Sequence, residues 1–170
     1  MARGAALVAL VLAANAARGE ITVTTEFEGG SAKVLAIDQE KKMVRIMPAG
    51  DPERGWPCWW YFRVDGLKVG DKLSLELVPS TAKLVQPGPR KGLPLDGSWA
   101  VPFRATFSTD AKTWRHTDPG RLQFGYAIYN VPVEAESLWL AWGPPFTPQD
   151  AAKLVKEIDA AGDWAESFEL

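Results

Sequence analysis

The sequence predicts an all-β protein: an antiparallel, jelly-roll-like β-sandwich followed by one C-terminal α-helix. Three observations support this prediction. Short segments alternate polar and apolar residues with a period of two, most clearly over residues 72–78. Turn-forming residues separate these segments at intervals of about ten residues, without the strand–helix–strand rhythm of a parallel sheet. A helical pattern is evident only near the C-terminus.

The expected strands are short segments that alternate in polarity or are rich in β-branched and aromatic residues: residues 21–27, 32–38, 43–47, 58–64, 72–78, 101–107, 113–116, 122–129 and 137–142. Gly29 and Gly30 predict a turn, and the charged segment 39–42 predicts a hairpin tip. Prolines and glycines crowd residues 79–98, which predicts a long loop. Because long loops often carry function, this loop is a candidate site.

The segment 55–70 is the most informative part of the chain. It places five aromatic residues within residues 56–62 and then two glycines, Gly66 and Gly70, four residues apart. This pattern predicts a central, buried strand that leaves through a glycine turn. The neighbours Trp59 and Trp60 must point to opposite faces of that strand. The chain has eight tryptophans, and we expect most of them in the core rather than on an exposed aromatic face.

The helix has a clear start and stop. Thr147 is the expected N-cap, Pro148 occupies the first helical position, and Asp150 completes a capping box. Gly162 is expected to end the helix. Its apolar residues share one face, which we expect to dock on a neighbouring surface: Ala151, Leu154, Val155 and Ile158.

Composition excludes some classes of function. Hydrophobic residues make up 46% and charged residues 24% of the chain, which is typical of a folded globular domain. The formal net charge is −2 and no cluster of basic residues occurs, which argues against nucleic-acid binding. The single cysteine, Cys58, cannot form an internal disulfide and is expected to be a buried small apolar side chain.

Residues 1–19 resemble a cleavable signal peptide. A short basic start precedes the apolar run 5–14, and small residues follow at positions 14 and 16. The run is too short to serve as a permanent membrane anchor. We therefore expect export, to the periplasm or outside the cell; the alternative is an Ala-rich N-terminal helix.

Residues 108–114 form a turn sequence that superficially resembles an Asp-box. Ser108 and Asp110 are expected to accept hydrogen bonds from turn amides, and Trp114 to pack under the turn. Ala111 stands where a glycine would be expected. These features favour a structural turn over a sugar or ion site.

Three segments in order resemble one known family. Residues 27–31 (FEGGS) resemble its opening turn, residues 60–64 (WYFRV) with their following glycines resemble its core strand, and residues 141–147 (AWGPPFT) resemble the segment that leads into its linking helix. The chain therefore resembles the N-terminal β-sandwich domain of cytosolic carboxypeptidase-type zinc metallocarboxypeptidases. The residues that carry this resemblance are expected to be structural: Phe27, Gly29, Trp60, Tyr61, Phe62, Gly66 and Gly70.

The resemblance implies a module without catalytic residues. The family's zinc site needs two histidines and a glutamate, whereas this chain has one histidine, His116, with no glutamate three residues on. We therefore expect no catalytic residue, metal ligand or cofactor in this chain; zinc would belong to a peptidase domain that is absent from it. Residues 20–146 are the expected sandwich, and residues 147–170 the expected helix and linker toward that domain.

The expected function is an interaction and structural domain that packs on, and supports, a metallocarboxypeptidase domain in cis or in trans. In a longer or split protein the whole would be a zinc metallocarboxypeptidase. One alternative is a carbohydrate-binding sandwich that uses surface tryptophans; a peptide ligand also stays open. The expected partner interface combines the end of the last strand with the helix: Trp142, Pro144, Pro145, Phe146, Leu154 and Ile158.

Overall fold

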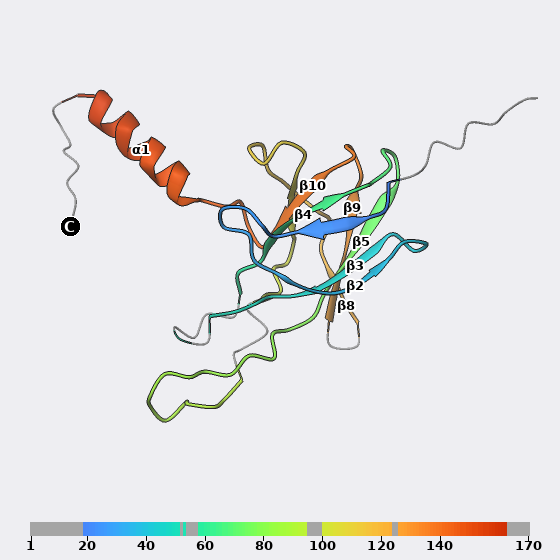
Figure 1. Cartoon of the computed structure of the whole chain (residues 1–170), viewed down its shortest axis with the longest axis horizontal. Helices are drawn as coiled ribbons and strands as arrows, with labels where there is room; N and C mark the ends of the chain where they lie inside the picture. The colour runs from blue at the N-terminus through green and yellow to red at the C-terminus, as the bar shows by residue number, and fades with distance from the viewer. Residues whose placement is uncertain (1–18, 52, 54–57, 95–99, 124–125, 163–170) are drawn as a thin grey trace, which may run out of the picture.

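Two five-stranded sheets and one helix make up the part of the chain that the computed structural model describes, residues 19–51, 53, 58–94, 100–123 and 126–162 (Figure 1). The strand order is β1-β4-β10-β6-β7 in the first sheet and β2-β3-β5-β9-β8 in the second. The predicted sandwich with a C-terminal helix is confirmed. The elements are β1 (Thr22–Thr24), β2 (Lys33–Asp38), β3 (Met43–Met47), β4 (Tyr61–Asp65), β5 (Lys72–Leu77), β6 (Thr106–Ser108), β7 (Arg115–His116), β8 (Arg121–Gln123), β9 (Tyr126–Pro132), β10 (Leu138–Ala141) and α1 (Pro148–Ala160).

The aromatic strand β4 is an interior strand of the first sheet, second in the order between the edge strand β1 and the central strand β10, so the sequence predicted its burial but not its exact place. Phe62 and Val64 are fully buried and point toward the second sheet, opposite Leu140 and Leu138 of β10. The strand leaves through Gly66, whose φ of 77° favours glycine. A side chain at this position would also collide with the carbonyl oxygen of Glu20, so no residue other than glycine fits here.

The second sheet is mixed rather than purely antiparallel. Its central strand β5 pairs antiparallel with β9 but parallel with β3, with Val44 opposite Leu75. The parallel pair arises because the chain crosses to the first sheet to form β4 and then returns as β5 in the direction of β3. The alternating residues Leu73, Leu75 and Leu77 of β5 are fully buried.

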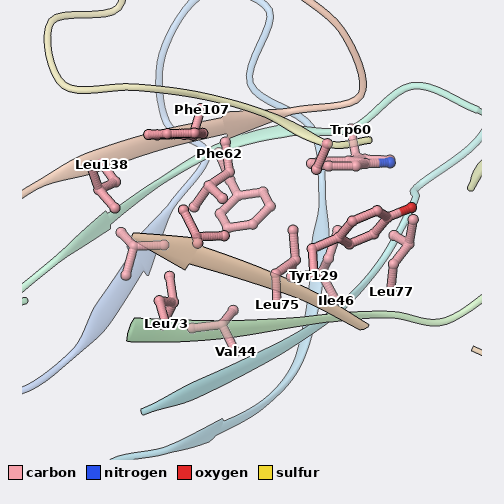
Figure 2. Packing of buried hydrophobic residues seen from close by; sticks show 14 of the residues in the cluster. Val44, Ile46, Trp60, Phe62, Leu73, Leu75, Leu77, Phe107, Tyr129 and Leu138 are labelled. Atoms are coloured by element: carbon pink, nitrogen blue, oxygen red, sulfur yellow. The ribbon is translucent and has the colours of Figure 1, made fainter. Parts of the chain in front are cut away.

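The core lies between the two sheets and is built around large rings (Figure 2). Trp60 is fully buried, and its indole N–H donates a 3.0 Å hydrogen bond to the carbonyl of Ala100. The Tyr129 hydroxyl donates to the carbonyl of Pro102 at 2.6 Å, and burial raises the pKa of Tyr129. Both hydrogen bonds tie the connection that precedes β6 to the core.

Several expected strands differ in extent from those observed; residues 21–27 were expected to be one strand, but β1 covers only Thr22–Thr24. Residues 101–107 were expected to be one strand, but β6 covers only Thr106–Ser108, because Pro102 lacks the N–H that a ladder requires. Residues 122–129 were expected to be one strand, whereas β8 and β9 form an antiparallel hairpin. Gly125 was the turn signal in the sequence.

The tryptophans are less buried than expected. Of the five in the described ranges, Trp60 is the one with no exposed surface. Trp59 and Trp60 do lie in contrasting environments, since Trp59 is partly exposed and its N–H donates to the carbonyl of Gly29. Cys58 is a free, partly exposed thiol rather than a buried one.

The turn before β7 is structural, as the sequence predicts. Asp110 accepts hydrogen bonds from the backbone N–H groups of Lys112 and Thr113, at 2.8 and 2.7 Å, and from the Ser108 hydroxyl at 2.9 Å. These three donors hold the pKa of Asp110 well below its ordinary value, and the two backbone N–H groups have the largest effect. Ala111 adopts a φ of 58°, which explains why glycine is expected there.

The helix start is confirmed in full. The Thr147 hydroxyl accepts from the N–H of Asp150 at 3.3 Å, and the Asp150 carboxylate accepts from the N–H of Thr147 at 2.8 Å. Donation from Thr147 lowers the pKa of Asp150. The last turn ends at Ala161 and the chain leaves through Gly162 at a φ of 132°.

Replacing Trp60 by phenylalanine is expected to lower the free energy of unfolding by about 2–3 kcal/mol, because it leaves a cavity and removes the partner of the Ala100 carbonyl. Urea denaturation followed by circular dichroism measures this change. Val69→Ala, at a residue that is 57% exposed, is the control and should change stability by less than about 0.5 kcal/mol. Equal effects of the two substitutions would contradict the assignment of Trp60 to the core.

Asp110→Asn is expected to lower the melting temperature by about 2–4 °C near pH 7, because the turn loses a charged acceptor. The pKa of Asp110 is lower in the folded state, so its stabilising effect is present above the ordinary pKa of 3.8 and is lost as the pH falls further. The difference in melting temperature between wild type and Asp110→Asn should therefore become smaller when melting curves are recorded below pH 4. Asp118→Asn, on an exposed residue nearby, is the control; a gap that does not change with pH would contradict the role of the carboxylate.

Thr147→Ala is expected to increase hydrogen exchange of the α1 amides about fivefold, because a lost N-cap costs about 1 kcal/mol. The melting temperature should stay unchanged, because no residue of α1 is buried. Exchange measured by mass spectrometry or NMR tests this, with Gln149→Ala in the same turn as the control. A fall in the melting temperature would instead mean that the helix supports the sandwich.

Candidate interaction surface

Long connections gather at one end of the sandwich, which we call the exit end. Within the sheets, register places the end of β3 beside the end of β5, and the start of β4 beside the end of β10, from which the chain leaves toward α1. The β-bridge between Ser31 and Tyr61 brings the two pairs to the same end, because Ser31 lies just before β2, whose start pairs with the end of β3. The segments 25–32 and 48–60 connect strands here, and residues 78–105 lead away from β5. The opposite end carries shorter connections, such as the hairpin tip 39–42.

Exposed apolar side chains are concentrated at the exit end. Of the eleven large hydrophobic residues that are exposed in the described ranges, seven lie on segments that leave it or return to it: Val85, Leu93, Phe103, Trp142, Phe146, Leu154 and Val155. The opposite end carries Val69. This asymmetry indicates that the exit end is the candidate interaction surface.

The six residues predicted as a partner interface all lie on the exit segment or on α1. Phe146 is 66% exposed, Leu154 46% and Trp142 38%. Pro144 is exposed, and Pro145 and Ile158 are partly exposed. Within the described residues, the structure places these side chains in order along the exit segment and the projecting helix rather than in one compact patch, and their role as an interface stays a prediction.

Helix α1 projects away from the sandwich (Figure 1), and none of its residues is buried. The expected docking of α1 on a neighbouring surface is therefore not seen within the described part of this chain. Its apolar stripe recurs at positions i, i+3, i+4 and i+7 and faces solvent along the helix: Ala151, Leu154, Val155 and Ile158.

A cluster around Tyr61 lies at the base of the helix, on the outer face of the first sheet. The Tyr61 ring makes edge-to-face contacts with Phe27 at 4.8 Å, Trp114 at 5.7 Å and Trp59 at 6.4 Å between ring centroids. Only 5% of Tyr61 is exposed. Burial, and secondarily the negative charge of Asp150, raises the pKa of Tyr61. The start of α1 therefore lies close to this cluster.

The sequence did not predict the Tyr61 cluster. Tyr61 was assigned to the family's core strand, and its position between the inward residues Trp60 and Phe62 does place it on the outer face. Phe27 and Trp114 come from remote segments, and nothing in their local sequence links them to Tyr61. Trp114 was expected to pack under its own turn, and its contact with the Tyr61 ring was not expected.

The partly exposed tryptophans are engaged by their neighbours, which weakens the carbohydrate-binding alternative. Trp59 and Trp114 contact the Tyr61 ring, and the Arg63 guanidinium lies 5.7 Å from the centre of the Trp139 ring. A platform for sugar rings needs free aromatic faces. The rings of Trp59, Trp114 and Trp139 are instead in contact with neighbouring side chains of the same chain.

The described residues do not fit a zinc site. No group of three or more His, Cys, Asp or Glu side chains in these ranges is arranged to hold a metal ion. His116 is exposed on β7. The same ranges contain no helix that is long and apolar enough to cross a lipid bilayer.

Solved structures with this fold include two bacterial enzymes. The metallo-carboxypeptidase from Burkholderia cenocepacia matches with a TM-score of 0.63 and 18% identity over 82% of this chain. The metallo-carboxypeptidase from Pseudomonas aeruginosa, in complex with (2-guanidinoethylmercapto)succinic acid, matches with a TM-score of 0.64 and 16% identity over 82% of this chain. The chain spans about a third of the length of each, 33% and 34%. A search of curated proteins by sequence finds no relative.

The expectation of an exported, periplasmic or secreted protein is wrong. It rested on residues 1–19, which lie outside the described residues except for Gly19. An apolar run of this kind does not by itself identify a signal peptide, because it also fits the Ala-rich N-terminal helix that was the alternative. The finding that overturns export is a family model described as the cytosolic carboxypeptidase N-terminal domain, which matches residues 23–142. This match covers the sandwich from β1 to the end of β10, and the chain belongs to the cytosolic carboxypeptidase N-terminal domain family.

Proposed function

We propose that this chain is a non-catalytic domain that packs on a metallocarboxypeptidase domain, in cis or in trans, and supports it. The carrying observation is the set of exposed apolar side chains that follows the last strand, Phe146, Leu154 and Val155, on the exit segment and on α1, a helix none of whose residues is buried. The family match ends at residue 142, and this chain spans a third of two metallo-carboxypeptidases. In a protein with this domain at its N-terminus, the chain would leave the sandwich at that surface.

The energetics favour a partner for this surface. Burying a large apolar side chain stabilises a complex by about 1.5–3 kcal/mol relative to leaving it in water. Phe146, Leu154 and Val155 are 66%, 46% and 42% exposed, so together they could contribute several kcal/mol toward the cost of association. The capping box preforms α1, which reduces the ordering cost on binding.

The proposal assigns catalysis to the partner domain. Zinc and the residues that activate water would come from that domain, because the described residues of this chain do not fit a zinc site. This chain would contribute a rigid apolar face at the base of the helix, where the Tyr61 cluster lies beside the start of α1.

The double substitution Phe146→Ser and Leu154→Ser is expected to weaken binding of the 170-residue chain to a metallocarboxypeptidase domain about 30-fold, as the loss of two apolar anchors implies. The probe is the separately produced part of the Pseudomonas aeruginosa enzyme that this chain does not match. Isothermal titration calorimetry measures the dissociation constant.

Val69→Ser, an exposed apolar residue at the opposite end, is the matched control and should leave the dissociation constant unchanged. Absence of any binding by the wild-type chain would sink the proposed function. If the double variant binds as tightly as the wild-type chain, the interface does not lie on the exit segment and α1.

A further inference from the structure

The long loop singled out in the sequence is an ordered arm that the proposed function does not explain. Over residues 81–94 the chain runs out from the sandwich and returns (Figure 1). The backbone N–H of Leu84 donates to the carbonyl of Leu93 at 2.9 Å, and the N–H of Gly92 donates to the carbonyl of Leu84 at 2.8 Å. Lys83 and Pro94 form a β-bridge beside these bonds. We call residues 81–94 the arm.

The arm is basic in a protein that is acidic overall. It carries Lys83, Arg90 and Lys91 and no Asp or Glu, whereas the whole chain has a net charge of −2. All three basic residues are exposed. A local excess of positive charge favours encounter with an acidic surface and adds specificity more than raw affinity.

The arm also presents apolar side chains. Val85 and Leu93 are both 52% exposed. Two apolar side chains beside an arginine can form the centre of a contact, with the lysines at its polar, solvent-accessible rim. The internal hydrogen bonds of the arm preform its shape, so little ordering would be required when it binds.

The arm and α1 project from the same end of the sandwich (Figure 1). The two extend in different directions (Figure 1), so a domain seated on the exit end between them would lie within reach of both. We propose that the arm is a second contact element, which binds an acidic and partly apolar surface of the same metallocarboxypeptidase domain; this inference rests on the proposed function. The two elements would contact that domain at separate points and fix its orientation.

The test is the salt dependence of binding to the same Pseudomonas aeruginosa probe. Wild-type chain should bind about tenfold more weakly at 500 mM than at 50 mM NaCl, because salt screens exposed charge pairs. The triple variant Lys83→Gln, Arg90→Gln and Lys91→Gln should bind about tenfold more weakly than wild type at 50 mM NaCl, and about equally at 500 mM. Lys68→Gln, Lys72→Gln and Lys112→Gln, a control that removes the same charge at the opposite end, should retain the wild-type dependence.

A second variant, Val85→Ser with Leu93→Ser, should weaken binding at both salt concentrations, because apolar contacts are not screened. Wild-type affinity and salt dependence in both arm variants would overturn the arm's role while leaving the proposed function standing. No binding by the wild-type chain would remove both proposals. Salt-dependent self-association that the triple variant abolishes would identify a second copy of this chain as the occupant, and would also overturn the inference.

Discussion

The packing of strand β4 on both of its faces is the interaction on which the rest of the structure depends. Trp60, Phe62 and Val64 fill the space between the sheets, while Tyr61 is buried on the opposite face by rings from remote segments. A shift of β4 by one residue would exchange these two sets of side chains. The register of one strand therefore determines both the core and the position of the outer aromatic cluster beside α1.

That double packing links the core to the exit end. The first residue of β4 pairs with the last residue of β10, Tyr61 with Ala141, so the chain leaves the sandwich next to the cluster. A side chain at Gly29 would contact both Tyr61 and the Thr147 methyl group, which shows how close the helix start lies. The exposed stripe of α1 thus begins from a well-packed base, although the helix itself contributes nothing to the core.

Local patterns in the sequence predicted the structure correctly where neighbouring residues determine it. The expected strand 43–47 coincides with β3, and Thr147 with Asp150 forms the expected capping box. The exit residues 142–146 were identifiable because they are consecutive and apolar. Long-range pairing was not identifiable: alternation in β3 and β5 does not reveal that they run parallel, and nothing local joins Trp114 to Tyr61. Proline and glycine content revealed a loop, but not that residues 81–94 form a hydrogen-bonded arm.

The parallel pairing of β3 and β5 has a consequence for how the molecule folds. These strands cannot meet through a simple hairpin, because the chain between them must first cross to the other sheet and supply β4. The entropy lost on closing the long loop between these strands must be overcome before their contacts can stabilise the fold. All-β topologies dominated by such non-local contacts fold in roughly milliseconds to seconds. During that interval the strand edges are unpaired, so the protein's exposure to aggregation is set by its topology more than by its final stability.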